Sequence, residues 1–310
     1  MEIVPYHGWA NNLRLSNGQV ELIVTLDVGP RVIAYRLLPD GKNVMKNYTE
    51  MLGGRGEPEW QIRGGSRFWL GPEDLTRTYY PDNNPVTYQE IAPGAVRFVP
   101  PPETEYGVQK EMEIYLSPTG SQVKLHLRVT NIGSEPTTLC PWGPTVMAPG
   151  GVEIIPLPEK FPHPGHPSRA KSPADYAPNQ QVAFWPYFDF SDSRFSFGRK
   201  YIQLRQDPTK GPTKIGLAHR LGWVAYLNEG TLFVMRFGYE EGANYPDNGG
   251  NYQSFSNEDM LEMEPIGPIS TLEPGRYAEL TMSWELHSNV PAVHTEAEID
   301  AVILPLIHRN

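Results

Sequence analysis

Cysteine is almost absent from this chain, since Cys140 is the only one among 310 residues. One thiol excludes an internal disulfide framework and fits a reducing compartment, so we expect a cytoplasmic protein. No apolar stretch of the secretory type precedes the first polar residues, although a signal peptide that had been removed would leave no trace. No apolar run approaches the length of a membrane span.

Positive charge is scarce as well. The chain has 26 lysines and arginines against 36 aspartates and glutamates, which gives a net charge of −10, and no basic block offsets it. Nucleic acids and anionic membrane surfaces attract basic patches, so we expect neither as a partner. The sequence carries no signal for a particular oligomeric state.

The motifs of several enzyme classes are also missing. The chain has no P-loop, no dinucleotide-binding fingerprint, no G-x-S-x-G elbow and no C-x-x-C pair. Cys140 precedes a proline with no histidine nearby in sequence, so we do not expect a thiol nucleophile. His163 and His166 stand in an H-P-G-H run without a third ligand at metal spacing. We therefore expect neither a metal nor a cofactor.

Aromatic residues and short strands, in contrast, are abundant. Seven tryptophans and 16 tyrosines supply large buried surfaces, which support a core although only 39% of the residues are apolar. Alternation of apolar and polar residues predicts strands. It is clearest over 122–130, where the apolar side chains that share one face are Val123, Leu125, Leu127 and Val129.

The strand pattern predicts an all-β protein. Two hairpins are expected, one over 20–26 and 31–38 and one over 108–116 and 122–130. Further strands are expected at 137–141, 152–155, 201–205, 214–218, 223–228 and 232–239. Thr295 and Glu298 form a capping box that begins the one helix we expect. Many antiparallel strands imply a sandwich or barrel, and with no composition break we expect one domain over 1–310.

Prolines cluster between Pro156 and Pro186, in a segment that includes L-P-E-K-F-P-H-P-G-H-P-S-R. Long loops without regular structure are uncommon and are often functional. Two interpretations remain open: a structured loop that crosses one face or covers a site, or a segment that only decorates the surface or forms an oligomer contact.

Two carboxylates stand in the run L-E-M-E at 261–264. Alternation sends Glu262 and Glu264 to the same face of a strand, about 7 Å apart along it. Carboxylates this close disfavour simultaneous ionisation unless cations compensate. The pair could supply a general base, accept hydrogen bonds from sugar hydroxyls, or lie on a solvent-exposed face of the strand.

A second cluster of chemical interest is Q-I-R-G-G-S-R-F-W-L-G-P-E-D at 61–74. The planar forks of Arg63 and Arg67 can bind carboxylate, phosphate or sugar oxygens. Trp69 could offer a flat face to a sugar ring, and Glu73 could bind hydroxyls. The arginine pair indicates either an acidic or phosphorylated sugar or structural pairing with nearby acids.

Two further segments contain polar and aromatic residues. Trp142 ends the strand in L-C-P-W-G-P, where it could stack on a ligand or fill the core. The run G-Y-E-E-G-A-N-Y-P-D-N-G-G-N-Y-Q leads toward the glutamate strand. Its Tyr245, Asp247 and Asn251 could bind hydroxyls, or the run could be an ordinary hairpin loop.

With these residues in view, the chain resembles the galactose mutarotase-like superfamily, which includes aldose 1-epimerases and hexose-6-phosphate epimerases. The resemblance is closest to a mutarotase-like domain family of unknown function and covers most of the chain. Five motifs carry it in order: N-G-Q-V-E-L-I-V-T-L-D-V-G-P-R-V-I-A-Y, R-G-G at 63–65, T-N-I-G-S-E-P, L-E-M-E, and P-G-R-Y-A-E-L-T-M-S-W-E-L. It implies a two-sheet β-supersandwich with a site on the concave face and Glu262 as the catalytic glutamate.

The chain also departs from this family. Where the epimerases place a histidine that protonates the ring oxygen, this sequence has Pro141, Trp142 and Gly143. Where they place a second sugar-binding histidine, Ser66 and Arg67 stand. Tryptophan has only an indole N–H and cannot exchange a proton near neutral pH. The glutamate is present without its usual acid partner.

Three hypotheses of function follow. The first is an enzyme that acts at a sugar anomeric centre, with Glu262 as base and Arg67, Arg63 or His219 polarising the ring oxygen. The second is a carbohydrate-binding module without turnover, in which Trp69 and Trp142 stack on the ligand. The third is a protein-interaction subunit of the same fold.

Overall fold

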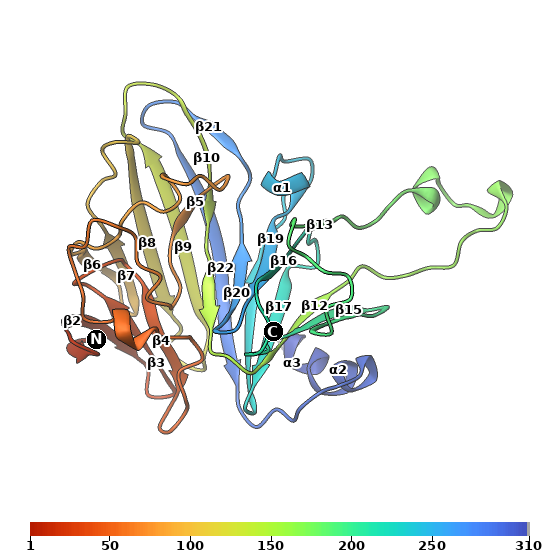
Figure 1. Ribbon diagram of the computed structural model, residues 1–310, viewed down its shortest axis with the longest axis horizontal. Helices are drawn as coiled ribbons and strands as arrows, with labels where there is room; N and C mark the ends of the chain where they lie inside the picture. Colours follow the sequence, from red (N-terminus) through yellow and green to blue (C-terminus); the bar gives the residue numbers. More distant parts are fainter. Residues whose placement is uncertain (309–310) are drawn as a thin grey trace.

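The larger layer of the structure is a ten-stranded antiparallel sheet (Figure 1). The computed structural model describes residues 1–308. In spatial order the ten strands are β14 (Phe195–Phe197), β15 (Tyr201–Arg205), β12 (Val152–Pro156), β17 (Trp223–Asn228), β18 (Thr231–Phe237), β22 (Tyr277–His287), β9 (Val123–Asn131), β8 (Val108–Leu116), β7 (Ala95–Val99) and β6 (Thr87–Ala92).

The opposing layer consists of a four-stranded and a five-stranded sheet. The first contains β1 (Glu2–Tyr6), β2 (Trp9–Ser16), β3 (Val20–Thr25) and β4 (Val32–Leu37). The second contains β11 (Thr145–Met147), β20 (Leu261–Pro265), β19 (Tyr252–Ser256), β16 (Thr213–Leu217) and β13 (Val182–Phe184). Ser66 pairs with both Val32 and Thr145, so a single bridging residue connects β4 to β11.

A small third sheet joins the two layers at one end. Its strands, in order, are β21 (Ser270–Leu272), β10 (Thr137–Trp142) and β5 (Trp69–Gly71). Trp142 and Trp69 are direct partners in the β10–β5 pair. This sheet therefore brings two tryptophans that are far apart in sequence next to each other.

The strand predictions are confirmed by the pairing. β3 pairs with β4 and β8 with β9 as expected, and the other predicted strands correspond to β10, β12, β15, β16, β17 and β18 within two residues at each end. In β9 the four alternating apolar residues are buried, while Lys124 is exposed. The strand pairs β1–β2 and β6–β7 were not predicted.

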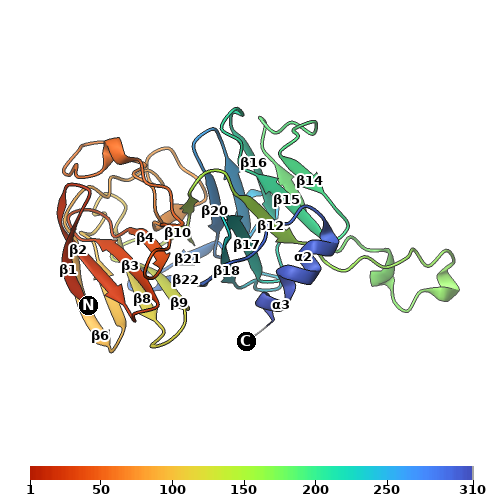
Figure 2. The same ribbon diagram turned by 90° about the horizontal axis from the view of Figure 1, so that it is seen from below.

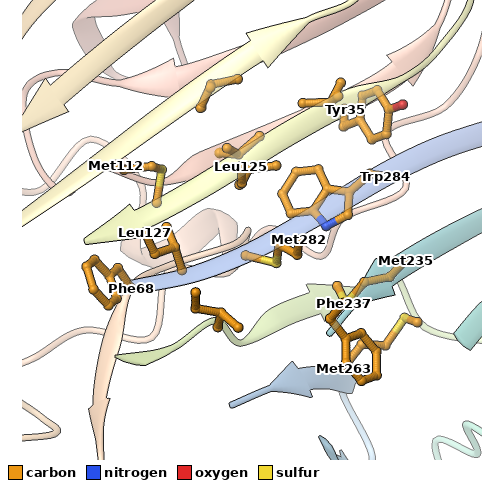
Figure 3. Packing of buried hydrophobic residues seen from close by; sticks show 14 of the residues in the cluster. Tyr35, Phe68, Met112, Leu125, Leu127, Met235, Phe237, Met263, Met282 and Trp284 are labelled. Atoms are coloured by element: carbon orange, nitrogen blue, oxygen red, sulfur yellow. The ribbon is translucent and has the colours of Figure 1, made fainter. Parts of the chain in front are cut away.

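The main core lies between the two layers. Figure 3 shows Leu125 and Leu127 of β9 with Met282 and Trp284 of β22, from the large sheet, gathered with side chains of the opposing layer. Met263 of β20 belongs to the same cluster and is fully buried. The inward residues of β20 therefore anchor that strand to the core, and its other face is left for polar groups.

The predicted C-terminal helix is confirmed. Thr295 accepts a hydrogen bond from the Glu298 amide, and the Glu298 side chain completes the capping box of α2 (Glu296–Val302). Together with α3 (Leu304–Ile307), α2 covers the outer face of β12, β17 and β18 through Ile299, Ile303 and Ile307. A further short helix is α1 (Pro246–Gly249), and single 3-10 turns are η1 (Thr49–Met51), η2 (Pro167–Arg169) and η3 (Pro173–Tyr176). Across residues 1–308, no helix is long and apolar enough to cross a membrane.

The proline-rich segment extends away from the sandwich (Figures 1 and 2). We call its residues 161–178, which include η2 and η3, the arm. The hydrogen bonds found for the arm stay within it, for example from the Lys171 amide to Asp175, and His163 packs against Tyr176 at 5.3 Å between ring centroids. After the arm the chain returns to β13, the edge strand of the five-stranded sheet beside β16.

Candidate functional site

Glu262 and Glu264 leave the same face of β20, as the alternation predicted. Leu261 and Met263 point the other way, into the main core. β20 lies between β11 and β19, so the two carboxylates stand inside the sheet rather than at its edge. Their exposed fractions are only 6% and 1%. Carboxylates buried this deeply require partners, because an uncompensated buried charge is costly.

Arg67 is the partner of Glu262. Its Nη2 donates to Oε1 of Glu262 at 2.8 Å, and both side chains are buried. Arg67 stands between Ser66, which bridges the two sheets, and β5, and its amide donates to the Pro144 carbonyl at 3.0 Å. These backbone contacts fix the arginine opposite β20, so the ion pair joins residues 195 positions apart.

Aromatic rings surround this ion pair. The guanidinium carbon of Arg67 lies 3.9 Å from the ring centroid of Trp69 and 5.4 Å from that of Trp60. Trp69 in turn meets Trp142 at 5.2 Å and Tyr79 at 5.0 Å, both edge to face. A buried cation on aromatic faces is stabilised by the ring quadrupoles. The arginine is therefore stacked as well as paired.

Lys214 of β16 is the partner of Glu264. Its Nζ donates to Oε2 of Glu264 at 3.1 Å and lies 5.0 Å from the ring centroids of both Trp142 and Trp185. Gly216 makes room for Trp185, since a Cβ there would come within 3.1 Å of the indole. Burial raises the pKa of Glu264 to about 7; Lys214 opposes this shift and Glu262 adds to it.

Several buried polar atoms around the two ion pairs lack a hydrogen-bond partner within residues 1–308. They are the indole nitrogens of Trp60, Trp69 and Trp142, Nε and Nη1 of Arg67, Oε1 of Glu264 and Oε1 of Gln253. Gln253 stands opposite Glu264 in the β19–β20 register. Buried donors and acceptors are normally paired, so a cluster of unpaired ones indicates a place for a polar ligand.

Two tyrosines lie near the carboxylates of this group, Glu73, Glu262 and Glu264. The Tyr79 hydroxyl donates to Oε1 of Glu73 at 2.5 Å. Burial is the main cause, and the Glu73 carboxylate the second cause, of a Tyr79 pKa raised far above its ordinary value. Tyr187 follows β13, and burial together with the charges of Glu264, Glu73 and Glu262 raises its pKa to about 12. The chain that returns from the arm therefore faces the carboxylates through Trp185 and Tyr187.

Of the residues expected at the site, the structure brings together Arg67, Trp69, Glu73, Trp142, Glu262 and Glu264. Asp247 is at the margin, where its Oδ2 accepts from Nε2 of Gln253 at 2.6 Å. Tyr245 and Asn251 form hydrogen bonds with the backbone instead. The Tyr245 hydroxyl accepts from the Glu240 amide. Nδ2 of Asn251 donates to the His219 and Gly238 carbonyls.

Arg63 does not join this group. Its guanidinium donates to Glu57 at 2.6 Å, to Asn83 at 3.0 Å and to the Met51 carbonyl, and it lies over the ring of Trp9. These contacts tie the N-terminal loops together. Arg63 and Arg67 are close in sequence, and the same role was expected of both. The turn at Gly64 and Gly65, both with positive φ, directs their side chains to different neighbours.

His219 is not available as an acid. The expectation that it could polarise a ring oxygen is wrong, because its ring is buried against Phe237 and Tyr252 and its Nε2 bonds with the Trp223 carbonyl at 2.9 Å. Burial lowers its pKa to about 4, so the imidazole is neutral near pH 7. Cys140 is buried too, and burial raises the pKa of its thiol to about 12.

Sequence reasoning missed Lys214, Trp60, Trp185, Tyr187 and Gln253. Lys214 had a signal, since it alternates with Ile215 and Leu217 in a strand that was predicted. The tryptophans and Tyr187 lie in loops, where no periodicity marks the direction of a side chain.

Comparison with known proteins identifies the fold. No family model and no curated protein match the chain. Among solved structures, a TPR-domain containing protein from Parabacteroides distasonis ATCC 8503 matches with a TM-score of 0.61 and 14% identity, over 91% of this chain and 48% of that one. The chain therefore spans about half the length of that protein.

Two other similar structures match over their whole length. A galactose mutarotase-like protein from Lactobacillus casei ATCC 334 has a TM-score of 0.56 and 11% identity, with 89% of this chain and 100% of that one covered. A galactose mutarotase related enzyme from Lactobacillus acidophilus has a TM-score of 0.53 and 11% identity, with 92% and 100% covered. The chain thus has the galactose mutarotase-like β-sandwich fold, as its motifs implied.

Proposed function

We propose that this protein binds a sugar at the face formed by β20, β16 and β5 and interconverts its anomers, with Glu262 as the base that accepts the proton of the O1 hydroxyl. The observation that carries the proposal is the Arg67–Glu262 ion pair beside a tryptophan cluster with unpaired donors. Aromatic faces with a few convergent polar groups suit a sugar. The ion pair also fixes the position of the Glu262 carboxylate, because Nη2 of Arg67 holds Oε1 at 2.8 Å.

Charge balance favours a neutral sugar over the acidic one that the arginine pair indicated. Arg67 and Lys214 already face Glu262 and Glu264, and Glu73 adds a further carboxylate nearby. Arg63, the other cation invoked for an acidic ligand, is engaged elsewhere. Each of the two cations at the site already faces a carboxylate, so an anionic substituent would compete with Glu262 or Glu264 for it.

The test is anomer exchange followed by NMR, with pure α-anomers of neutral, acidic and phosphorylated sugars. We expect faster exchange than in buffer for at least one neutral sugar. Glu262→Gln should lower that acceleration by about 10²–10⁴-fold, the usual contribution of a general base. Glu258→Gln, which changes an exposed carboxylate just before β20, is the matched control and should keep the full rate. Exchange at the buffer rate for every sugar would overturn catalysis.

A second candidate is sugar binding without turnover. It is favoured by Trp142, which stands where the resemblance expects the histidine that protonates the ring oxygen. Calorimetry with the same panel separates the two candidates, because a binding module gives heat of binding and no faster exchange. No binding at millimolar sugar would overturn both.

A further inference from the structure

The proposed reaction needs a proton donor for the ring oxygen, and the expected donors fail. Arginine stays protonated at all relevant pH and is a poor acid. His219 is neutral and buried among core aromatics. The pKa values of Tyr79 and Tyr187 are raised well away from neutrality, so neither gives up a proton easily near pH 7.

We propose that Glu264 is the general acid of this site, a carboxylic acid that protonates the ring oxygen while Glu262 accepts the O1 proton. The proposal rests on the proposed function above. It names the acid partner of Glu262, for which this chain lacks the usual histidine. The assignment uses a carboxyl group that this chain carries two positions after Glu262 on the same strand.

The geometry of β20 supports this assignment. Glu262 and Glu264 are two positions apart on one face, about 7 Å along the strand, so both can reach oxygens attached to the same carbon. Oε2 of Glu264 is held by Lys214, whereas Oε1 is buried and without a partner. Oε1 is therefore the oxygen that can carry a proton toward a bound ligand.

The surroundings of the two carboxyl groups differ. The charged and titratable groups that face Glu264 are Lys214, Glu262, Arg67 and Tyr187, with Tyr252 and Glu153 on the core side. Glu262 has the guanidinium of Arg67 at 2.8 Å, whereas Glu264 is fully buried and has the neighbouring Glu262 charge against it. Glu262 therefore has a cation in direct contact with its Oε1, whereas Oε1 of Glu264 has no partner among residues 1–308.

Lys214 is a positioning residue in this scheme. Its ammonium is fixed over the faces of Trp142 and Trp185 and holds Oε2 of Glu264. When Glu264 gives up its proton, the new carboxylate forms beside a cation that is already in place. A preorganised charge of this kind stabilises the state that develops during the reaction.

The step balances without a co-reactant. Glu262 accepts the proton of the O1 hydroxyl, the O1 electrons form the carbonyl, the C1–O5 bond breaks, and O5 takes the proton of Glu264. The open chain rotates about its C1–C2 bond. In the reverse step O5 attacks the other face of C1, its proton returns to Glu264, and the Glu262 proton returns to O1.

The test compares Glu264→Gln, Lys214→Met and the Glu258→Gln control by NMR exchange rate across pH and by calorimetry. For the wild type we expect the rate to fall above about pH 7, where Glu264 loses its proton. Glu264→Gln should lose at least ~100-fold in rate and lack this alkaline decline, while calorimetry still detects sugar binding. Lys214→Met should move the decline to higher pH, because the ammonium lowers the pKa of Glu264.

The outcomes separate the two proposals. If the wild type accelerates exchange and Glu262→Gln is inactive, but Glu264→Gln keeps the full rate and pH profile, the assignment of Glu264 is overturned and the proposed function stands. If the wild type does not accelerate exchange, both fall. If Glu264→Gln does not fold by circular dichroism, an unshifted alkaline decline in folded Lys214→Met overturns the assignment.

Discussion

Glu153 shows at the residue scale how this sandwich holds an acid without a cation. It lies on β12 with no exposed surface, between the layers and behind the sheet that carries Glu264. Its two carboxyl oxygens accept hydrogen bonds from the Tyr252 and Ser254 hydroxyls. Burial raises its pKa to about 7, the hydroxyls oppose that shift, and the charge of Glu264 adds to it.

This raised pKa predicts a pH-dependent loss of stability. The folded protein keeps a proton on Glu153 that the unfolded chain releases above the ordinary carboxyl pKa of 4.5, so stability is full below pH 4.5 and falls until about pH 7. Relative to Glu153→Gln, the wild type should lose about 3 kcal/mol of unfolding free energy across that window. Urea unfolding at several pH values measures it. Parallel pH curves for the two proteins would contradict the expectation.

The acids of the site could be predicted from sequence, but their cations could be predicted only in part. Alternation alone placed Glu262 and Glu264 on one face, because a strand has only two faces. It could not assign Lys214 to Glu264, since 50 residues separate them and the pairing of β16, β19 and β20 decides their contact. Arg63 and Arg67 looked equivalent in sequence, and only the turn between them separates their roles.

At the element scale, the arm forms its hydrogen bonds mainly within itself rather than with the sandwich. The segment closes at its base, where Lys160 reaches Gln180 at 3.3 Å and Asn179 reaches the Glu159 carbonyl at 3.3 Å. The hydrogen bonds found within 161–178 are local, and most of its residues are exposed. Trp185 and Tyr187, by contrast, lie beyond the arm and face the site.

Removal of the arm should therefore leave the sandwich and the site intact. Replacing 161–178 with a short Gly-Ser linker between Lys160 and Asn179 shortens a loop. The entropic cost of closing that loop then falls by less than about 1 kcal/mol. We expect an unchanged or slightly higher thermal midpoint and unchanged sugar affinity, measured by calorimetry. The same replacement combined with Trp185→Ala is the contrasting variant and should weaken binding. A clearly lower midpoint for the arm deletion alone would show that the arm packs on the body.

Strands with one buried face were predictable, and strands with little burial were not. β9 and β22 alternate strictly because one face meets the core. β1 and β6 are edge strands whose residues are mostly exposed, so no apolar periodicity marked them. The third sheet escaped prediction because β5 and β21 have only three residues each.

At the scale of the whole molecule, the site lies where three sheets meet. Arg67 comes from the link between the four-stranded and five-stranded sheets, Trp69 and Trp142 from the small third sheet, and Glu262 and Lys214 from the five-stranded sheet. Moving these sheets apart would break the Arg67–Glu262 ion pair and the contact of Lys214 with Trp142. A ligand that contacts all three therefore acts on the packing of the sheets as well as on a single strand.

This arrangement predicts a distinct pattern of amide hydrogen exchange on sugar binding. Amides of β8, β9 and β22 exchange only when the whole sandwich unfolds, and those of β5, β16 and β20 exchange when the site opens. Both kinds of opening release the sugar, so at 100 times its Kd each should slow by about 100-fold. Amides of the arm, β1 and β6 exchange by local fraying that leaves the ligand bound, and should keep their rates. Mass spectrometry of peptides from each region measures the difference, and slowing confined to one strand would mean that the ligand does not bind across the three sheets.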